Sequence, residues 1–358
     1  MPHSDSQPFL GVVFHAIGGL AAASFYLPYR RVRQWSWETY WIVGGVFSWL
    51  IAPLAAALII VPNTFEILRA APSSALLHAW LLGMLWGIGG LTFGLSMRYL
   101  GIALGYAVAL GFCAAFGTLV PPLWDGQFTA LAASTSGQWI LGGVALCLIG
   151  IGCSGNAGLG KERDLTVEKK KGTVTEFSFG KGMLVAFACG LLSACMSFAF
   201  RVGAPVVETA IAQGVPSLWA ALPLLVVILL GGLTTNLIWC LILNARRGTF
   251  GEYFGRTTAR TPTPVARNFL FCALAGLAWY LQFFFYSMGE SRMGAQFHFS
   301  SWTLHMAAII IFSTIWGLWL HEWRGVSRRT QLWVGAGLGT LILATIIVGY
   351  GNSLSAAH

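Results

Sequence analysis

AWYLQFFFYSMG (residues 278–289) and AQFHFSSWTLHM (residues 295–306) are two apolar runs separated by a short polar turn. Neither run contains a Lys, Arg, Asp or Glu side chain, and apolar sequence continues from the first toward residue 268 and from the second toward residue 320. A run of about 20 apolar residues is long enough for a helix to cross the hydrocarbon core of a bilayer. The two runs therefore predict a pair of consecutive transmembrane helices.

The same pattern recurs along the whole chain. Of its 358 residues, 56% are hydrophobic and only 9% are charged, whereas about 25% of the residues of a soluble domain are charged. We therefore expect an all-α membrane protein. Its ten transmembrane helices are predicted at residues 9–28, 37–62, 75–97, 101–121, 137–155, 182–202, 216–244, 268–289, 296–320 and 331–350.

The basic residues predict how these helices are oriented. Lysine and arginine are enriched in the loops that face the cytoplasm. In the ten-helix arrangement Arg69, Arg201 and Arg292 lie on one side, and the other 18 of the 21 basic residues lie on the opposite side. Both termini are therefore expected to be periplasmic. Because the basic residues occupy short loops rather than one face of a domain, the expected partner is the lipid bilayer and not a nucleic acid.

The two halves of the chain are similar to each other. Trp139 and Gly143 match Trp333 and Gly337 at an offset of 194 residues, and further Gly and Trp matches follow in the same order. A repeat with an odd number of helices is inverted in its second copy, as in many alternating-access transporters. We expect a first five-helix repeat, a basic cytoplasmic linker and a second five-helix repeat, at residues 1–155, 156–181 and 182–358.

Aromatic and uncharged polar residues gather on the faces of the two opening helices. Trp279, Gln282 and Tyr286 share one helical face, and Trp302 and His305 share a face of the next helix. This combination suits a sugar, because aromatic rings cover its C–H faces and neutral polar groups bind its hydroxyls. We predict that these residues line one cavity, with Trp86 added from the matching helix of the first repeat. The alternative is that the rings are core or interfacial aromatics and the polar groups join helices.

Four strings resemble the L-rhamnose–proton symporter family of the drug/metabolite transporter superfamily. They are WSWET (35–39), MRYLG (97–101), WYLQFFFY (279–286) and SWTLHM (301–306), and the resemblance extends over nearly the full length. It implies a ten-helix protein of the bacterial inner membrane that takes up L-rhamnose or a related deoxysugar. It also implies that a proton is the coupling ion and that no nucleotide, metal or other cofactor takes part.

A proton-coupled carrier needs a titratable group inside the membrane. No Asp or Glu lies near the middle of a predicted span, so the candidates are His305 and, further out, His15. Histidine suits the task because its unperturbed pKa, about 6.5, lies near physiological pH. The alternative is that both histidines only position the substrate and that Glu38, at the inner mouth, accepts the proton. Glu38 also has a structural explanation, because Ser36 precedes it as a predicted N-cap and a carboxylate is favourable in the first turn of a helix.

Two other functions explain less of the sequence. An exporter of drugs or metabolites on the same ten-helix scaffold would use a looser apolar pocket. A membrane-embedded enzyme would need paired carboxylates or metal ligands, and the chain has no DxD, HExxH or GxSxG arrangement. We therefore expect a transporter with no catalytic residues and no metal site.

Overall fold

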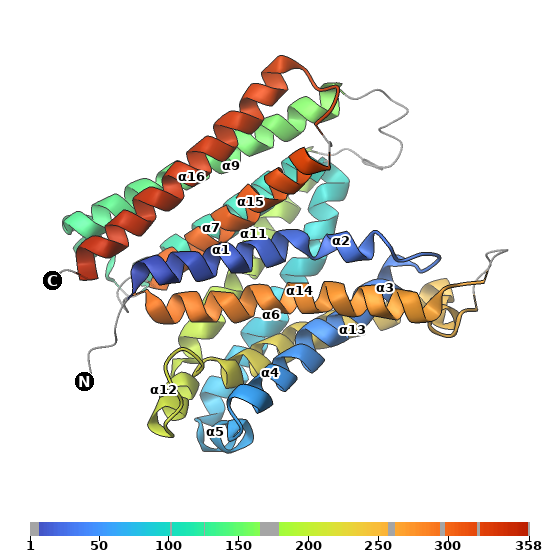
Figure 1. The fold of residues 1–358 in the computed structure, drawn as a ribbon, viewed down its shortest axis with the longest axis horizontal. Coiled ribbons are helices and arrows are strands. Elements are labelled where there is room, and N and C mark those ends of the chain that lie inside the picture. Colours follow the sequence, from blue (N-terminus) through green and yellow to red (C-terminus); the bar gives the residue numbers. More distant parts are fainter. Residues whose placement is uncertain are drawn as a thin grey trace. The chain divides into compact units, whose positions relative to one another are not determined.

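A computed structural model describes residues 7–100, 102–124, 126–164, 179–256, 262–293, 298–320 and 323–356. The regular structure of these residues is entirely helical (Figure 1). In the first half the helices are α1 (Pro8–Ser24), α2 (Tyr26–Tyr29), α3 (Trp37–Val46), η1 (Phe47–Ile51), α4 (Ala52–Ile60), α5 (Thr64–Ala70), α6 (Ser73–Leu100), α7 (Ile102–Trp124), α8 (Phe128–Ala133) and α9 (Thr135–Asp164). In the second half they are α11 (Phe179–Val202), α12 (Ala204–Ala212), α13 (Leu222–Arg247), η2 (Thr249–Phe254), α14 (Val265–Arg292), α15 (His298–Trp319) and α16 (Arg328–Ala356).

Nine helical segments of the described residues are long and apolar enough to cross a membrane. They coincide with nine of the ten predicted spans, which confirms the prediction of an all-α membrane protein. The remaining prediction, residues 101–121, falls on α7, whose described apolar part, Val108–Trp124, is shorter. Of the predicted linker 156–181, residues 165–178 lie outside the described residues.

Proline and glycine explain where the helices differ from the predicted ranges. α13 begins at Leu222 rather than at residue 216, with Pro223 in its first turn, where the missing backbone N–H costs no hydrogen bond. The same helix ends before Gly248, whose φ of 68° is left-handed and favours glycine at a helix end. The short helices α5, α8 and α12 lie outside the predicted spans.

A π-helical turn, η1, lies between α3 and α4. It spans Phe47–Ile51, and Pro53 follows in the first turn of α4. Because Pro53 has no N–H to donate to the carbonyl of Trp49, the α-helical ladder is interrupted at this point. Such turns redirect side chains and are frequent at functional sites.

The described residues belong to two compact units. The first unit comprises the described parts of Met1–Leu20, Gly89–Phe198 and Met288–His358, and the second comprises Ala21–Ile88 and Ala199–Ser287. Each unit therefore draws on both halves of the sequence. The unit boundaries fall inside four helices, α1, α6, α11 and α14.

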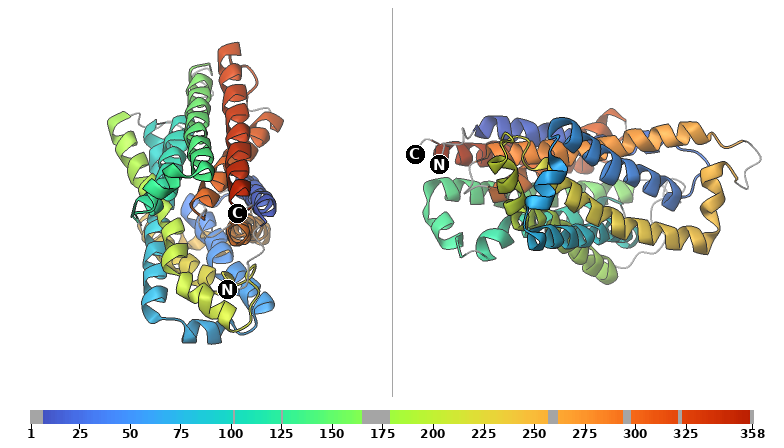
Figure 2. Two further views of the ribbon diagram at one scale, coloured as in Figure 1. Left: turned by 90° about the vertical axis from the view of Figure 1, so that its left-hand side faces the viewer. Right: turned by 90° about the horizontal axis from the view of Figure 1, so that it is seen from below.

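In the first unit α9 and α16 lie side by side along most of their length, as Figures 1 and 2 show. At one end of this pair the carboxylate of Asp164 accepts hydrogen bonds from the backbone N–H of Ser327 (2.7 Å) and the hydroxyl of Thr330 (2.6 Å), at the start of α16. These hydrogen bonds lower the pKa of Asp164, which lies outside the apolar span. The same bonds connect the end of α9 to the start of α16.

In the second unit α3, η1 and α4 pack against α13. Asn236 of α13 is fully buried and connects three helices. Its Oδ1 accepts a hydrogen bond from the indole N–H of Trp41 at 2.9 Å, and its Nδ2 donates to the carbonyl of Gly87 in α6 at 3.3 Å. A buried amide with partners on two neighbouring helices fixes their register in an environment without competing water.

Candidate functional site

The first unit brings together the two histidines that the sequence singles out. His15 of α1 and His305 of α15 are each 1% exposed, and their ring centroids lie 6.1 Å apart with the planes at 65°. Gly289 of α14 lies directly against His15, because a Cβ atom at this position would be only 2.8 Å from Cε1 and Nε2 of the imidazole. Two buried imidazoles in contact can exchange or share a proton with modest changes in their surroundings.

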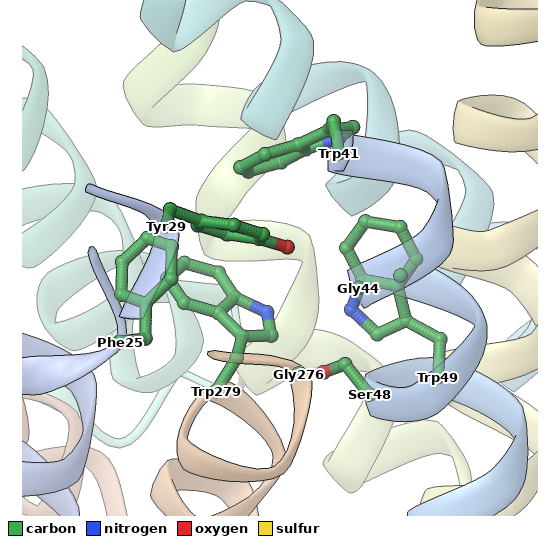
Figure 3. Close-up of a pocket in the computed structure, with 9 residues that line it drawn as sticks. Phe25, Tyr29, Trp41, Gly44, Ser48, Trp49, Gly276 and Trp279 are labelled. Atoms are coloured by element: carbon green, nitrogen blue, oxygen red, sulfur yellow. The ribbon is translucent and has the colours of Figure 1, made fainter. Parts of the chain in front are cut away.

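The second unit contains a small pocket of aromatic residues (Figure 3). The space between its lining side chains, counted together with the solvent at its mouth, is about 200 Å³. Five of the side chains that line it are aromatic, and Ser48 and three glycines complete the lining. The aromatic residues are Phe25, Tyr29, Trp41, Trp49 and Trp279.

Neighbouring rings hold the pocket's side chains in place. The rings of Phe25 and Trp279 are 4.2 Å apart between centroids, and those of Trp41 and Trp49 are 6.1 Å apart. The η1 turn carries both Ser48 and Trp49 into the lining. Where α3 and α14 meet, a Cβ atom at Gly44 would collide with the hydroxyl of Tyr29, so glycine is required there for Tyr29 to reach the pocket.

The predicted sugar-contact residues of the second unit have different surroundings. Trp279 lines the pocket. Trp86 is buried and does not line the pocket, and its ring lies 6.2 Å from that of Trp49 and 5.2 Å from that of Phe283. Gln282, one helical turn from Trp279, is 3% exposed, and its Nε2 has no hydrogen-bond partner among the described residues. Tyr286 is buried against the ring of Phe200 at 5.2 Å.

The other two predicted contact residues, Trp302 and His305, belong to the first unit. The indole N–H of Trp302 donates a hydrogen bond to the carbonyl of Cys113 at 3.0 Å, and its ring packs on Gly117. This contact gives Trp302 a role in joining α15 to α7. Because the six residues are divided between the two units, their common cavity stays a prediction.

Glu38 is fully buried in the first turn of α3 and is an ion-pair partner. One carboxylate oxygen lies 3.0 Å from Nη1 of Arg247, and the other accepts a hydrogen bond from the hydroxyl of Thr249 at 3.2 Å. Ser36 occupies the predicted N-cap position, but its hydroxyl bonds to Thr39 and Glu252 instead of capping the helix. Glu38 thus connects the start of α3 with the end of α13, which favours its structural explanation.

The sequence pattern does not predict most of the pocket. Tyr29, Trp41, Ser48 and Trp49 lie on segments that indicate only membrane spans and their ends. The available signal was Ser48 and Trp49, a polar and an aromatic residue near the middle of an apolar span, a few residues before Pro53. A proline there predicts an interrupted helix, which is a common setting for binding residues in membrane transporters.

Comparison with known proteins shows the family of the chain. Residues 5–354 match the model of the family described as L-rhamnose-proton symport protein. The chain belongs to this family. Proteins of the symporter family from Klebsiella pneumoniae subsp. pneumoniae and Salmonella dublin, each called an L-rhamnose-proton symporter, are 40% and 41% identical to the chain over 342 residues. The alignments cover 96% of this chain and 97% of each relative.

A further symporter, from Shigella dysenteriae serotype 1, is 40% identical over 343 residues. The family is one of transporters and not of enzymes, in agreement with the sequence-based prediction. The family description names L-rhamnose and a proton, and it names no cofactor. Together with the nine long apolar helices among the described residues, the bacterial relatives identify the chain as a multi-pass protein of the bacterial inner membrane.

Proposed function

We infer that this chain takes up L-rhamnose or a related deoxysugar together with a proton across the inner membrane. The observation that carries this inference is the similarity, over nearly the whole of both chains, to proteins called L-rhamnose-proton symporters. The geometry agrees with it, because one unit contains a buried histidine pair and the other an uncharged aromatic pocket. Nothing in the family match favours the alternative of an exporter.

His15 and His305 are the proposed proton carriers. Both residues meet the requirements of an intramembrane proton site, since each is titratable, each is buried and the two rings are neighbours. Glu38 is the alternative carrier, but its carboxylate is engaged with Arg247 and Thr249. Contact of the sugar with Trp86, Trp279, Gln282, Tyr286, Trp302 and His305 remains part of the proposal, and the position of Trp279 in the pocket supports it.

The proposed architecture is ten transmembrane helices in two inverted repeats, residues 1–155 and 182–358, joined by the linker 156–181. An inverted repeat requires reciprocal contacts between corresponding helices. Gly337 follows Gly143 by 194 residues, and Val348 follows Ser154 by the same 194. A Cβ atom at Gly143 would lie 2.6 Å from Cγ2 of Val348, and a Cβ atom at Gly337 would lie 2.6 Å from Oγ of Ser154. This exchange of partners between α9 and α16 supports a two-fold relation between the repeats.

A second pair of contacts in the first unit follows the same rule. A Cβ atom at Gly19 of α1 would lie 2.8 Å from the carbonyl carbon of Ala308 in α15. A Cβ atom at Gly190 of α11 would lie 2.8 Å from the backbone nitrogen of Cys113 in α7. Gly190 follows Gly19 by 171 residues, and Ala308 follows Cys113 by 195. The sixth span corresponds to the first, and the ninth corresponds to the fourth. The first and ninth spans thus meet in the same way as the sixth and fourth spans, which again supports an inverted repeat.

The proposed orientation, with both termini periplasmic, predicts the outcome of labelling. Single cysteines introduced at Lys170 and Thr257, in a background without native cysteines, should react with an impermeant thiol reagent only after the cells are broken. The reason is the positive-inside rule, since 18 of the 21 Lys and Arg residues lie on that side. A cysteine at Ser74, in the opposite predicted loop, is the matched control and should react in intact cells. The reverse pattern at these positions would invert the proposed topology.

Uptake into proteoliposomes tests the proposed function directly. With one proton per sugar, an inward gradient of one pH unit should concentrate labelled L-rhamnose about tenfold, because one pH unit is about 1.4 kcal/mol. The expected result is accumulation that a protonophore abolishes and that protein-free liposomes do not show. Accumulation that is indifferent to the protonophore would contradict proton coupling, and the absence of L-rhamnose transport would contradict the substrate.

A further inference from the structure

We propose that the aromatic pocket of the second unit binds the sugar, with Trp49, Trp279 and Ser48 as its hydrogen-bonding residues. The choice of L-rhamnose as ligand rests on the proposed function, whereas the binding site is inferred from the side chains of the pocket. It extends the sequence-based prediction, which includes Trp279 but neither Ser48 nor Trp49.

Three polar atoms of the pocket are buried without a hydrogen-bond partner among the described residues. They are Nε1 of Trp49, Nε1 of Trp279 and Oγ of Ser48. The side chains of Trp49 and Ser48 are 3% and 2% exposed. Buried donors are nearly always paired in folded proteins, because an unpaired one has lost its water without compensation. Three of them around one space indicate a ligand that supplies acceptors.

The directions of these groups agree with a common ligand. Figure 3 shows the indole nitrogens of Trp49 and Trp279 turned toward the same space, with the hydroxyl of Tyr29 directed into it as well. The indole N–H of Trp41, in contrast, is used by Asn236, so this residue offers the ligand only its ring. The walls are therefore aromatic, and the donors lie on two opposite sides, on η1 and on α14.

The chemistry of the lining defines the class of ligand. None of the nine described residues that line the pocket is charged, so nothing compensates the desolvation of an ionised ligand. An indole N–H can only donate, so the ligand must present acceptor oxygens. Aromatic faces bind C–H and methyl groups. A neutral deoxyhexose has all three properties, since it is uncharged, carries several hydroxyl oxygens and has an apolar methyl group.

The place of these residues along their helices agrees with a transport site. Ser48 and Trp49 lie near the middle of the span Trp37–Ile60, and Trp279 lies near the middle of the span Val265–Arg292. Substrate sites of repeat-built transporters lie near the bilayer midplane and use interrupted helices. The π-helical turn η1 is such an interruption, and it carries two of the three unpaired groups.

Replacement of each tryptophan by phenylalanine tests the donors and keeps a ring in place. Trp49→Phe, Trp279→Phe and Ser48→Ala should each raise the Kd of the detergent-purified protein for L-rhamnose about tenfold, as expected for loss of one buried hydrogen bond. The melting temperature of the sugar-free protein should not fall in Ser48→Ala, because this hydroxyl has no hydrogen-bond partner among the described residues to lose. Trp139→Phe is the matched control in the first unit, on an exposed ring, and should bind like the wild type.

The outcomes separate this proposal from the proposed function. If the wild type binds and transports L-rhamnose and all three variants bind it with the wild-type Kd, the pocket is not the site although the function stands. If another neutral sugar binds in place of L-rhamnose and its binding is lost in the variants, the pocket stands and the substrate is wrong. Failure of every neutral sugar, or equal binding of a charged one such as D-galacturonate, would overturn the pocket proposal.

Discussion

Accumulation of L-rhamnose driven by a gradient of one pH unit should fall about tenfold, to equal concentrations inside and outside, when His15 or His305 is replaced by glutamine. Glutamine has a similar reach and can still form hydrogen bonds, but it has no proton to load and release near neutral pH. Exchange of labelled for unlabelled sugar at equal pH should persist, because exchange needs no net proton movement. The measurement is uptake into proteoliposomes with and without a pH gradient.

A matched control separates the loss of coupling from a general effect of removing a histidine. His78 is exposed near the start of α6, and His78→Gln should accumulate sugar like the wild type. The histidine assignment would be refuted if the double variant His15→Gln, His305→Gln still accumulated sugar and Glu38→Gln did not. That result would identify the carboxylate of Glu38 as the proton carrier.

Removal of the cation beside Glu38 should destabilise the protein. Glu38 is fully buried while Arg247 is more than half exposed, and their charged atoms are 3.0 Å apart. Arg247→Ala leaves a buried carboxylate with Thr249 as its remaining hydrogen-bond partner among the described residues, at a cost of about 2–3 kcal/mol. The melting temperature in detergent should fall by several degrees, and Arg246→Ala, at the exposed neighbouring position, should change it little.

A second substitution distinguishes this structural explanation from a role in proton coupling. Glu38→Gln removes the buried charge, so the double variant Arg247→Ala, Glu38→Gln should be more stable than Arg247→Ala alone. Proton-driven accumulation should survive in Glu38→Gln if the ion pair is only structural. Equal stability of the single and double variants would show that the unpaired carboxylate of Glu38 is not the cause of the loss.

The sequence by itself determined the fold class and the family. Apolar runs of about 20 residues are a property of consecutive residues, and the bilayer requires each one to satisfy its backbone hydrogen bonds as a helix. For this reason nine predicted spans coincide with nine long apolar helices in the part of the chain that the structure describes. The strings WSWET and WYLQFFFY carried the family resemblance, which the full-length match confirms. The prediction that His15 is functional also came from local information, since a histidine deep in an apolar helix is rare.

Only the tertiary structure decided which residues meet. Every face of a membrane helix can be apolar, because lipid and protein interior are both apolar, so periodicity does not show which face packs inward. The spacing of Trp279, Gln282 and Tyr286 places them on one helical face, but of these three residues only Trp279 lines the pocket. Its companions Ser48 and Trp49 are more than 200 residues away in sequence, and a π-helical turn directs them. Likewise, His15 contacts His305 because α1 packs against α15. Gly19 allows the backbones of these two helices to approach closely, and Gly289 of α14 leaves room for the ring of His15. Such contacts follow from the shapes of whole helices, which no single stretch of sequence contains.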